Sequence, residues 1–442
     1  MSDYEVFENI KKSKKPASTV PGDLPRKLLK EFGLEMSTPA SYIYRNIIKT
    51  GIWPKQWRTE YGTPIQKKPN PETEDDLRII SLTSFLSKTF ERFVIDWLLF
   101  YIGDKLDWSQ YGGLKGSSIT HYLVDLVNFI KYNQDLKVPH AVIALLIDYK
   151  STFNRVNHNI VVNILSELGT PGWLLRIVVG FLSERELIVK YKGLQSERMM
   201  LPGSCPQGTL LGLFLFLVLI NAAGSGYLQK HIGNFITKSL NKRKPMPDIT
   251  LKYIDDMTQA FAVNVREVTS VDPNLVGRLS YHERTGHIQN VNTLLPAQQE
   301  LEKAVEYCKI NEMMINFPKT NVMFFNSSRK VDFLPRLQVG ADKYLEVVPR
   351  QKLLGVIIQD DLRWNSNTQN LCKNGFRKLW MIRRLKNLGA KEEELLDVYV
   401  KQIRSGLELA VPVWEPGLTK RERKQLERVQ KTAFSIILSI NY

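Results

Sequence analysis

Cysteine is scarce in this sequence of 442 residues: Cys205, Cys308 and Cys372 lie far apart and form no CxxC pair. Neither a disulfide framework nor a zinc site is therefore indicated, and the sequence favours a reducing, intracellular setting. A hydrophobic share of 43% and a charged share of 24% are those of an ordinary globular protein, which excludes disorder over the whole length.

Long apolar runs are also lacking. The longest, over 210–220, ends at Asn221 and is shorter than the roughly 20 residues that a membrane-spanning helix needs, so it predicts a buried helix. The N-terminus carries early acidic residues and has no apolar segment of the kind found in a secretory signal. We therefore expect an intracellular protein with no membrane partner, and the sequence does not distinguish nucleus from cytoplasm.

Positive charge, by contrast, is abundant. The formal net charge is +16, and between Arg363 and Tyr442 sixteen Lys and Arg stand against eight Asp and Glu, so this segment contributes +8, half of the total. Such an excess predicts a polyanionic partner. A basic surface that binds nothing is the alternative, because charge alone names no chemistry.

The predicted elements mix strands and helices in an irregular order. Residues 141–147 form a continuous apolar run that ends in Asp148, which is typical of a central strand buried on both faces. Further strands are predicted over 249–253, 257–263, 321–325 and 353–358, helices over 90–101, 160–168, 298–309 and most of the last eighty residues, and an inserted loop over 271–292. Because there is no regular βαβ repeat, the predicted class is α+β.

Three carboxylates carry the candidate chemistry. Asp148 ends the hydrophobic strand, and Asp255 and Asp256 occupy the turn between two predicted strands. Adjacent aspartates at the tip of an apolar hairpin repel each other, and a divalent cation removes that conflict. If Asp148 lies beside the pair, the three predict a two-metal site for phosphoryl transfer with Mg²⁺ as the fitting ion. The tetrapeptide 253–256 alone is weak evidence, because an exposed polar turn explains it equally well.

Eight sequence blocks stand in a fixed order. They are PIQKK at 64–68, LRIISL at 77–82, QYGGLKGSS at 110–118, IDYKSTF at 147–153, PQGTLLG at 206–212, YIDD at 253–256, NFPKT at 316–320 and LLGV at 353–356. In this order they resemble the reverse transcriptases of non-LTR (LINE-type, jockey-like) retrotransposons, and the likeness runs from Lys11 to the C-terminus. The resemblance implies a right-hand polymerase fold with fingers, a palm that contains an antiparallel sheet, and a helical thumb.

The resemblance also implies roles for single residues. Asp148, Asp255 and Asp256 match the ligands of two Mg²⁺ ions, for which Mn²⁺ could substitute, and Lys319 matches a lysine that protonates the leaving pyrophosphate. The nucleotide-binding matches are Lys68 (or its neighbour Lys67), Arg78, Phe153, Gln207 and Gly208. The ring of Phe153 is expected to exclude a 2′-hydroxyl and so to favour dNTPs. A core aromatic at 153 and solvated lysines at 68 and 319 remain the alternatives.

Three segments are expected along the chain: an N-terminal extension over 1–60, fingers and palm over 61–361, and an incomplete helical thumb over 362–442. Basic side chains of the thumb should hold the template–primer backbone. They are Lys373, Arg377, Lys378, Arg383, Arg384 and Lys386, and then Lys420, Arg421, Arg423, Lys424, Arg428 and Lys431. The stripe of Leu426, Val429, Gln430, Ala433, Phe434 and Ile437 is interpreted as thumb packing.

The sequence thus predicts an RNA-directed DNA polymerase, a nucleotidyltransferase that adds dNTPs to a DNA primer on an RNA template. The endonuclease of such elements is not expected, because the chain lacks room for it. Asn154, Leu213 and Ala222 depart from the family pattern and leave the three aspartates in place. These departures keep open a catalytically decayed relative that binds nucleic acid through its basic surface. An RNA-templated RNA polymerase is a third hypothesis, against which Phe153 argues.

Overall fold

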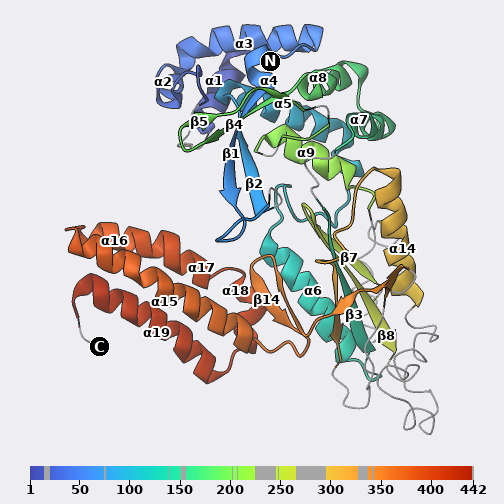
Figure 1. Ribbon diagram of the computed structural model, residues 1–442, viewed down its shortest axis with the longest axis vertical. Helices are drawn as coiled ribbons and strands as arrows, with labels where there is room; N and C mark the ends of the chain where they lie inside the picture. Colours follow the sequence, from blue (N-terminus) through green and yellow to red (C-terminus); the bar gives the residue numbers. More distant parts are fainter. Residues whose placement is uncertain are drawn as a thin grey trace. The chain divides into compact units, whose positions relative to one another are not determined.

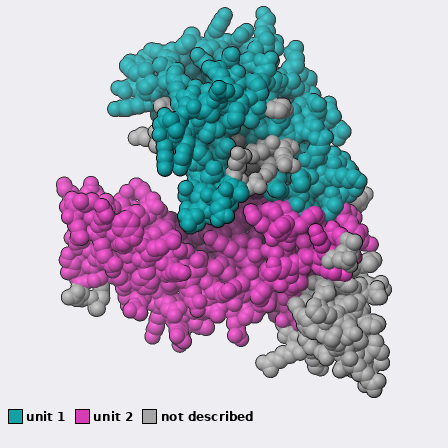
Figure 2. Space-filling model, viewed as in Figure 1, with its two compact units in different colours: residues 1–108, 149–225, 304–315 teal, residues 109–148, 226–303, 316–442 magenta. Residues whose placement is uncertain are grey.

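The computed structural model describes residues 1–13, 20–73, 76–138, 140–150, 156–201, 203–206, 208–223, 245–246, 248–264, 295–326, 337–340 and 343–440. The chain forms two compact units, each assembled from three stretches. Unit 1 contains residues 1–108, 149–225 and 304–315, and unit 2 contains residues 109–148, 226–303 and 316–442 (Figure 2). Within the described ranges, no helix combines the length and the apolar character needed to cross a bilayer.

Unit 1 is mostly helical. Its helices are α1 (Asp3–Lys12), α2 (Arg26–Glu31), α3 (Gly33–Thr50), α4 (Lys55–Arg58), α5 (Phe85–Ile102), α7 (His158–Glu167), α8 (Gly172–Leu182) and α9 (Leu210–Leu219), with a 3-10 turn over Gly103–Lys105. The helices predicted over 90–101 and 160–168 are confirmed as α5 and α7, and the apolar run near 210 forms the buried helix α9. Aromatic rings join the helices: Phe90 lies 4.8 Å from Tyr44 and 5.2 Å from Trp53, centroid to centroid.

A small sheet completes unit 1. Its strands are β1 (Thr59–Gln66), β2 (Leu77–Leu82), β4 (Glu186–Tyr191), β5 (Leu194–Gln195) and β6 (Met199–Met200). The order is β2-β1-β4-β5, with β6 also paired to β4; β1 is antiparallel to β2 and parallel to β4. The first two sequence blocks therefore lie on the two arms of one hairpin, β1–β2.

Unit 2 is built on a five-stranded sheet. Its strands are β3 (His140–Asp148), β7 (Ile249–Tyr253), β8 (Asp256–Asn264), β9 (Asn321–Phe325) and β12 (Glu346–Val347), in the order β12-β9-β3-β8-β7. Strand β3 is central, antiparallel to both β8 and β9, and buried from residue 141 to 147, which confirms the prediction of a buried central strand. Strand β8 begins one residue earlier than predicted, so Asp256 belongs to the strand.

Helix α6 (Ile119–Gln134) packs against one face of this sheet (Figure 1). Val142, Ala144 and Leu146 share a buried core with α6, and so does the hairpin of β13 (Arg350–Leu353) and β14 (Val356–Gln359). The prediction of one strand over 353–358 is therefore wrong. Leu354 and Gly355 have φ values of 48° and 93°, and two consecutive positive φ values reverse the chain into a tight hairpin.

Helix α14 (Leu295–Ile310) confirms the predicted helix over 298–309 and crosses the division between the two units. Strands β10 (Gln338–Gly340) and β11 (Lys343–Tyr344) form a separate ribbon. The predicted inserted loop over 271–292 lies outside the described residues.

The C-terminal part of unit 2 is helical, as predicted. It comprises α15 (Asn365–Asn387), α16 (Glu392–Val398), a π-helical turn over Tyr399–Arg404, α17 (Ser405–Leu407), α18 (Val411–Trp414), a 3-10 turn over Glu415–Gly417, and α19 (Lys420–Leu438). Helices α15 and α19 lie side by side (Figure 1). Val429, Ala433 and Ile437 are buried against α15, which confirms the packing interpretation for these three positions. Gln430 of the same stripe is exposed, so for this residue the interpretation is wrong. The mixture of helices and antiparallel strands confirms the α+β class.

Candidate active site

Asp148 and Asp256 face each other across two adjacent strands of unit 2. They are direct partners in the antiparallel register of β3 and β8. Directly opposed residues of an antiparallel pair project from the same face, with Cβ atoms about 4.5–5.5 Å apart. Because the alternate residues Leu146 and Ala144 point into the α6 core, the two carboxylates project from that same face, at the end of the strands. The predicted approach of Asp148 to the turn at 253–256 is thus present.

The two like charges oppose each other electrostatically. Burial in the first place, and then the carboxylates of Asp255 and Asp148, raise the pKa of Asp256 to about 6. Like charges placed directly opposite each other destabilise a sheet. The repulsion expected from the sequence therefore adds to the effect of burial on Asp256, and a bound cation would relieve both.

Asn316 orients the carboxylate of Asp148, a role that the sequence did not indicate. Its Nδ2 donates to Oδ2 of Asp148 at 2.7 Å, and its main-chain N–H donates to the Asp148 carbonyl oxygen at 2.7 Å. The Asp148 N–H in turn donates to Oγ1 of Thr320, which is fully buried, at 3.2 Å. Both partners belong to the NFPKT block at 316–320. The sequence signal that could have pointed to these two residues was the place of this block in the ordered series.

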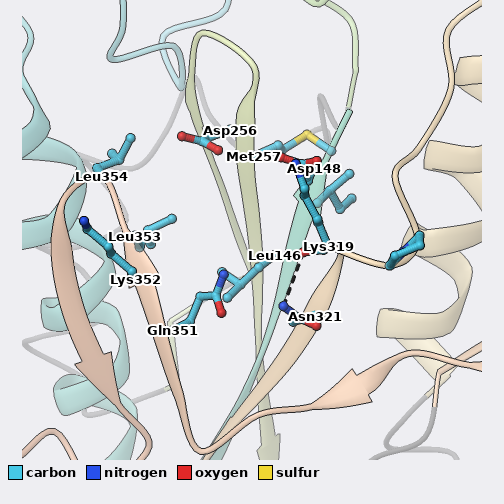
Figure 3. A pocket seen from close by; sticks show the side chains of 12 residues that line it. Leu146, Asp148, Asp256, Met257, Lys319, Asn321, Gln351, Lys352, Leu353 and Leu354 are labelled. Carbon is cyan, nitrogen blue, oxygen red and sulfur yellow. Dashed lines mark hydrogen bonds between the residues drawn. The ribbon is translucent and has the colours of Figure 1, made fainter. Parts of the chain in front are cut away.

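A cavity of about 300 Å³ opens beside the two carboxylates, within unit 2. Figure 3 shows Asp148, Asp256 and Lys319 around it, together with Gln351 and Lys352 of β13. Lys319 is exposed, its N–H donates to the Asn316 carbonyl oxygen at 2.9 Å, and its side chain lines the same cavity as the carboxylates. The predicted lysine and two of the predicted aspartates are thus brought together, and β13 adds polar residues that the sequence did not single out.

The turn that carries Asp255 has a strained backbone. β7 and β8 pair Tyr253 with Asp256, which leaves Ile254 and Asp255 as the two loop residues, and Ile254 has φ +60°. Positive φ is an outlier for a β-branched residue and costs about 1–2 kcal/mol. Of the described residues, those lining the cavity include Asp256 but not Asp255. No cluster of three or more His, Cys, Asp or Glu suited to a metal ion occurs in the described part of the chain, so the three-ligand site stays a prediction.

The predicted nucleotide-binding residues lie in unit 1. Lys67, Lys68 and Arg78 are exposed on the β1–β2 hairpin, and Lys68 forms an ion pair with Asp76 at 2.9 Å. Gly208 has φ +122° and lies in close contact with strand β2 of the same hairpin. A Cβ atom at this position would lie 2.4 Å from the Ser81 carbonyl oxygen. Only glycine fits this position, and it brings the PQG block against the strand that carries Arg78. Phe153 and Gln207 lie outside the described residues.

Glu91 holds the start of α9, which lies within the PQG block. This carboxylate is fully buried, and its Oε2 accepts hydrogen bonds from the N–H groups of Leu210 and Leu211 at 2.7 and 3.0 Å. These are N-terminal donors of α9 that lack a partner within the helix, and a carboxylate also suits the positive end of the helix dipole. Burial raises the pKa of Glu91. The start of α9, two residues after Gly208, is therefore held in place by a residue of α5 that the sequence did not single out.

Some of the predicted basic side chains of the C-terminal helices bond other parts of the protein, and others are exposed. Lys378 donates to the Gln402 carbonyl oxygen at 2.7 Å, and Lys386 donates to main-chain oxygens at the end of α19. Arg423 pairs with Glu415 at 2.9 Å. The exposed members on α15 are Lys373, Arg377, Arg383 and Arg384. Among them stand Phe376 and Trp380, which are 39% and 55% exposed. Aromatic rings between basic side chains form a surface suited to nucleic acid.

The chain matches the family model of reverse transcriptase (RNA-dependent DNA polymerase) over residues 65–356. The match covers more than half of the chain and includes the carboxylate pair, strand β2 with the turn that precedes it, and the PQG block. The chain therefore belongs to the reverse transcriptase family.

The chain is also similar to two curated polymerases of mobile elements. A probable RNA-directed DNA polymerase from transposon BS of Drosophila melanogaster is 27% identical over 219 residues, which cover 48% of this chain and 24% of that protein. The RNA-directed DNA polymerase from mobile element jockey, also of Drosophila melanogaster, is 29% identical over 179 residues, which cover 40% of this chain and 19% of that protein. The predicted resemblance to non-LTR, jockey-like reverse transcriptases is confirmed, and the chain spans a quarter or less of these relatives.

Proposed function

We propose that this chain is the polymerase portion of a non-LTR retrotransposon protein and extends a DNA primer on an RNA template. The observation that carries the proposal is the facing pair Asp148 and Asp256 in a cavity that Lys319 also lines. This arrangement unites the acidic and basic groups that phosphoryl transfer needs. The family match and the names of the relatives supply the reaction class.

The proposed parts of the polymerase follow from the fold. The sheet of β3, β7, β8, β9 and β12 takes the place of the palm, and the β1–β2 hairpin that of the fingers. Helices α15 to α19 take the place of the thumb. The division of the chain into 1–60, 61–361 and 362–442 remains a proposal, since residues 1–60 share unit 1 with the β1–β2 hairpin.

The carboxylates fit a hard divalent cation. They are oxygen ligands, and oxygen is the ligand that Mg²⁺ prefers. Burial first, and then the neighbouring carboxylates, raise the pKa of Asp256 and so disfavour its charged form, which a bound cation would stabilise. Asp148 and Asp256, with Asp255 as the third ligand, would hold two Mg²⁺ ions, with Mn²⁺ as a substitute. When bound, the metal supplies activation of the primer 3′-hydroxyl and neutralisation of phosphate charge.

The remaining site residues act on the incoming nucleotide. Arg78 and Lys68 bind the triphosphate through their fixed positive charges, once Lys68 leaves its ion pair with Asp76. Gln207 contacts the incoming nucleotide, and Gly208 allows the backbone to approach closely. Phe153 excludes the 2′-hydroxyl of an rNTP. Lys319 gives a proton to the departing pyrophosphate, a general-acid role that requires it to come within hydrogen-bond reach.

Primer extension tests the proposal directly. The chain, with poly(rA)/oligo(dT), dTTP and Mg²⁺, should incorporate dTTP, and Asp255→Ala/Asp256→Ala should reduce the rate by about 10³-fold or more. Asp360→Ala/Asp361→Ala is the matched control, because these two aspartates are also adjacent and follow a hairpin strand of unit 2. Incorporation by the wild type that survives the first double substitution would contradict the assignment of the site.

The same assay separates the two alternatives. A decayed relative binds the primer–template duplex with or without Asp255→Ala and incorporates no dNTP. An RNA-templated RNA polymerase incorporates rNTPs without further change. If Phe153 excludes the 2′-hydroxyl, Phe153→Val admits rNTPs, and unchanged sugar selectivity would remove Phe153 from this role.

A further inference from the structure

Residues 109–112 cover the outer edge of the strand that leads into the catalytic turn. Strand β7 is the last strand of its sheet. The Lys252 N–H donates to the Ser109 carbonyl oxygen at 2.8 Å, and the Tyr111 N–H donates to the Lys252 carbonyl oxygen at 2.8 Å. This short parallel bridge satisfies main-chain groups of an edge strand and protects that edge from foreign pairing. All of these residues belong to unit 2.

Gln110 extends this contact to the strained residue of the turn. Its Oε1 accepts a hydrogen bond from the Ile254 N–H at 3.0 Å and another from the Gly112 N–H at 3.0 Å. The side chain is only 6% exposed. One buried oxygen therefore joins the QYGG loop to the residue whose positive φ reverses the chain before Asp255 and Asp256.

Gly112 leaves room for the same turn. A Cβ atom at this position would lie 2.8 Å from both the main-chain nitrogen and Cγ1 of Ile254, and 3.1 Å from the carbonyl carbon of Tyr253. Real Cβ atoms do not approach backbone this closely, so a larger residue at 112 displaces the turn. The close approach of two main chains explains why glycine stands here.

The loop itself is anchored to the core. The Tyr111 hydroxyl donates to Oδ2 of Asp125 on α6 at 2.5 Å, and its ring packs edge-to-face on Tyr122 at 5.8 Å between centroids. The Tyr122 hydroxyl is within hydrogen-bond distance of Oγ1 of Thr258 on β8, at 2.6 Å. Helix α6 therefore holds both the loop and the strand that begins with Asp256.

We propose that Gln110 and Gly112 act as positioning residues that hold the Ile254–Asp255 turn in its strained conformation and thereby orient Asp255 and Asp256. This inference rests on the proposed polymerase function for its kinetic consequence. Its structural consequence does not depend on activity. Without the acceptor at Gln110, the turn relaxes toward negative φ at Ile254, and the carboxylates lose their orientation while the fold is kept.

Four single variants and one double variant test the clip, which is the set of contacts from Gln110 and Gly112 to the Ile254–Asp255 turn. Gln110→Met has nearly the same length and lacks the acceptor, whereas Gln110→Glu keeps an acceptor oxygen; among the described residues, Nε2 of Gln110 has no hydrogen-bond partner to lose. Ile254→Gly removes the Cβ atom that disfavours positive φ. Gln298→Met is the matched control, because Oε1 of Gln298 also accepts from a main-chain N–H, that of Gln338 at 2.9 Å, in the same unit.

Hydrogen exchange and kinetics are the two readouts. In Gln110→Met we expect faster exchange in the peptide 249–257 and a fall in kcat of about 10- to 100-fold with dNTP KM and primer–template Kd nearly unchanged. Gln298→Met should keep both properties, and Gln110→Glu, which keeps the acceptor, should keep the slow exchange in 249–257. Gln110→Met/Ile254→Gly should recover to the kcat of Ile254→Gly alone, since glycine adopts the turn without help.

The outcomes separate this inference from the proposed function. If Gln110→Met leaves hydrogen exchange in 249–257 unchanged, the clip is overturned. It is also overturned if the effects of Gln110→Met and Ile254→Gly on kcat are additive. A loss of kcat accompanied by an equal loss of primer–template binding also overturns it, because it indicates general unfolding. If the wild type incorporates no dNTP while the exchange result is as expected, the polymerase proposal fails and the clip stands.

Discussion

Asn316 and Asp148 are joined by two hydrogen bonds, one from the side-chain Nδ2 to Oδ2 and one from the main-chain N–H to the carbonyl oxygen, both at 2.7 Å. The two residues are 168 positions apart in sequence and belong to different blocks of the family pattern. The first bond fixes the carboxylate, and the second fixes the strand end from which it projects. The geometry of the carboxylate pair therefore depends on a neutral residue.

Asn316→Ala should reduce kcat about 10- to 100-fold, because the Asp148 carboxylate loses the donor that orients it toward Asp256. The KM for dNTP should change little, since the proposed triphosphate ligands lie in unit 1. Steady-state primer extension measures both constants. Asn374→Ala is the control, because Nδ2 of Asn374 also bonds a side-chain oxygen, that of Asn370 at 3.2 Å. A change confined to KM would contradict the role given to Asn316.

Asp256→Asn should stabilise the protein while it inactivates the site. The substitution removes one of two facing like charges, so in EDTA the Tm should rise by about 2–4 °C. Primer extension should fall about 10³-fold or more, because an amide is a poor substitute for a carboxylate ligand. Differential scanning calorimetry measures the first effect. A lower Tm would show that Asp256 is stabilised by its surroundings rather than strained by them.

Gly208→Ala should be costly because the added methyl group meets backbone. The new Cβ atom would lie 2.4 Å from the Ser81 carbonyl oxygen, and φ is +122°. We expect a rise in dNTP KM of about 10-fold or more and a loss of about 2–4 kcal/mol in unfolding free energy.

Gly193→Ala separates the cost of contact with the backbone from the cost of positive φ. Gly193 also has positive φ, +85°, but no described atom lies within 4 Å of its Cβ position. It should lose only about 1 kcal/mol and keep its KM. Denaturant unfolding and steady-state kinetics measure the pair. Equal losses in the two variants would mean that contact with β2 is unimportant.

Helix α15 should contact the template–primer duplex through both charge and aromatic surface. Arg377→Ala should lower the slope of log K against log salt by about 0.7–0.9, because one phosphate contact is lost. Trp380→Ala should weaken binding about 5- to 10-fold at every salt concentration and leave the slope unchanged. Lys401→Ala is the control, since Lys401 is already paired with Asp397 at 2.5 Å. Fluorescence anisotropy over a salt series measures the slopes, and an unchanged slope in Arg377→Ala would place the duplex elsewhere.

Local sequence patterns were sufficient to predict several features of this protein. The run over 141–147 is apolar at every position and short, which is typical of a strand buried on both faces. The stripes of α5 and α14 have helical period, and the eight blocks indicated both the family and the candidate aspartates. In each case the relevant information lies within one element or in the order of elements.

The mutual arrangement of these elements was decided by tertiary contact. Pairing of Asp148 with Asp256 depends on the register between β3 and β8, because a slip of one residue would send one carboxylate to the other face. The segment over 353–358 is apolar throughout, and only the positive φ values at Leu354 and Gly355 divide it into two strands. Asn316 and Gln110 resemble ordinary polar loop residues in sequence, since a hydrogen bond between distant segments leaves no periodic trace.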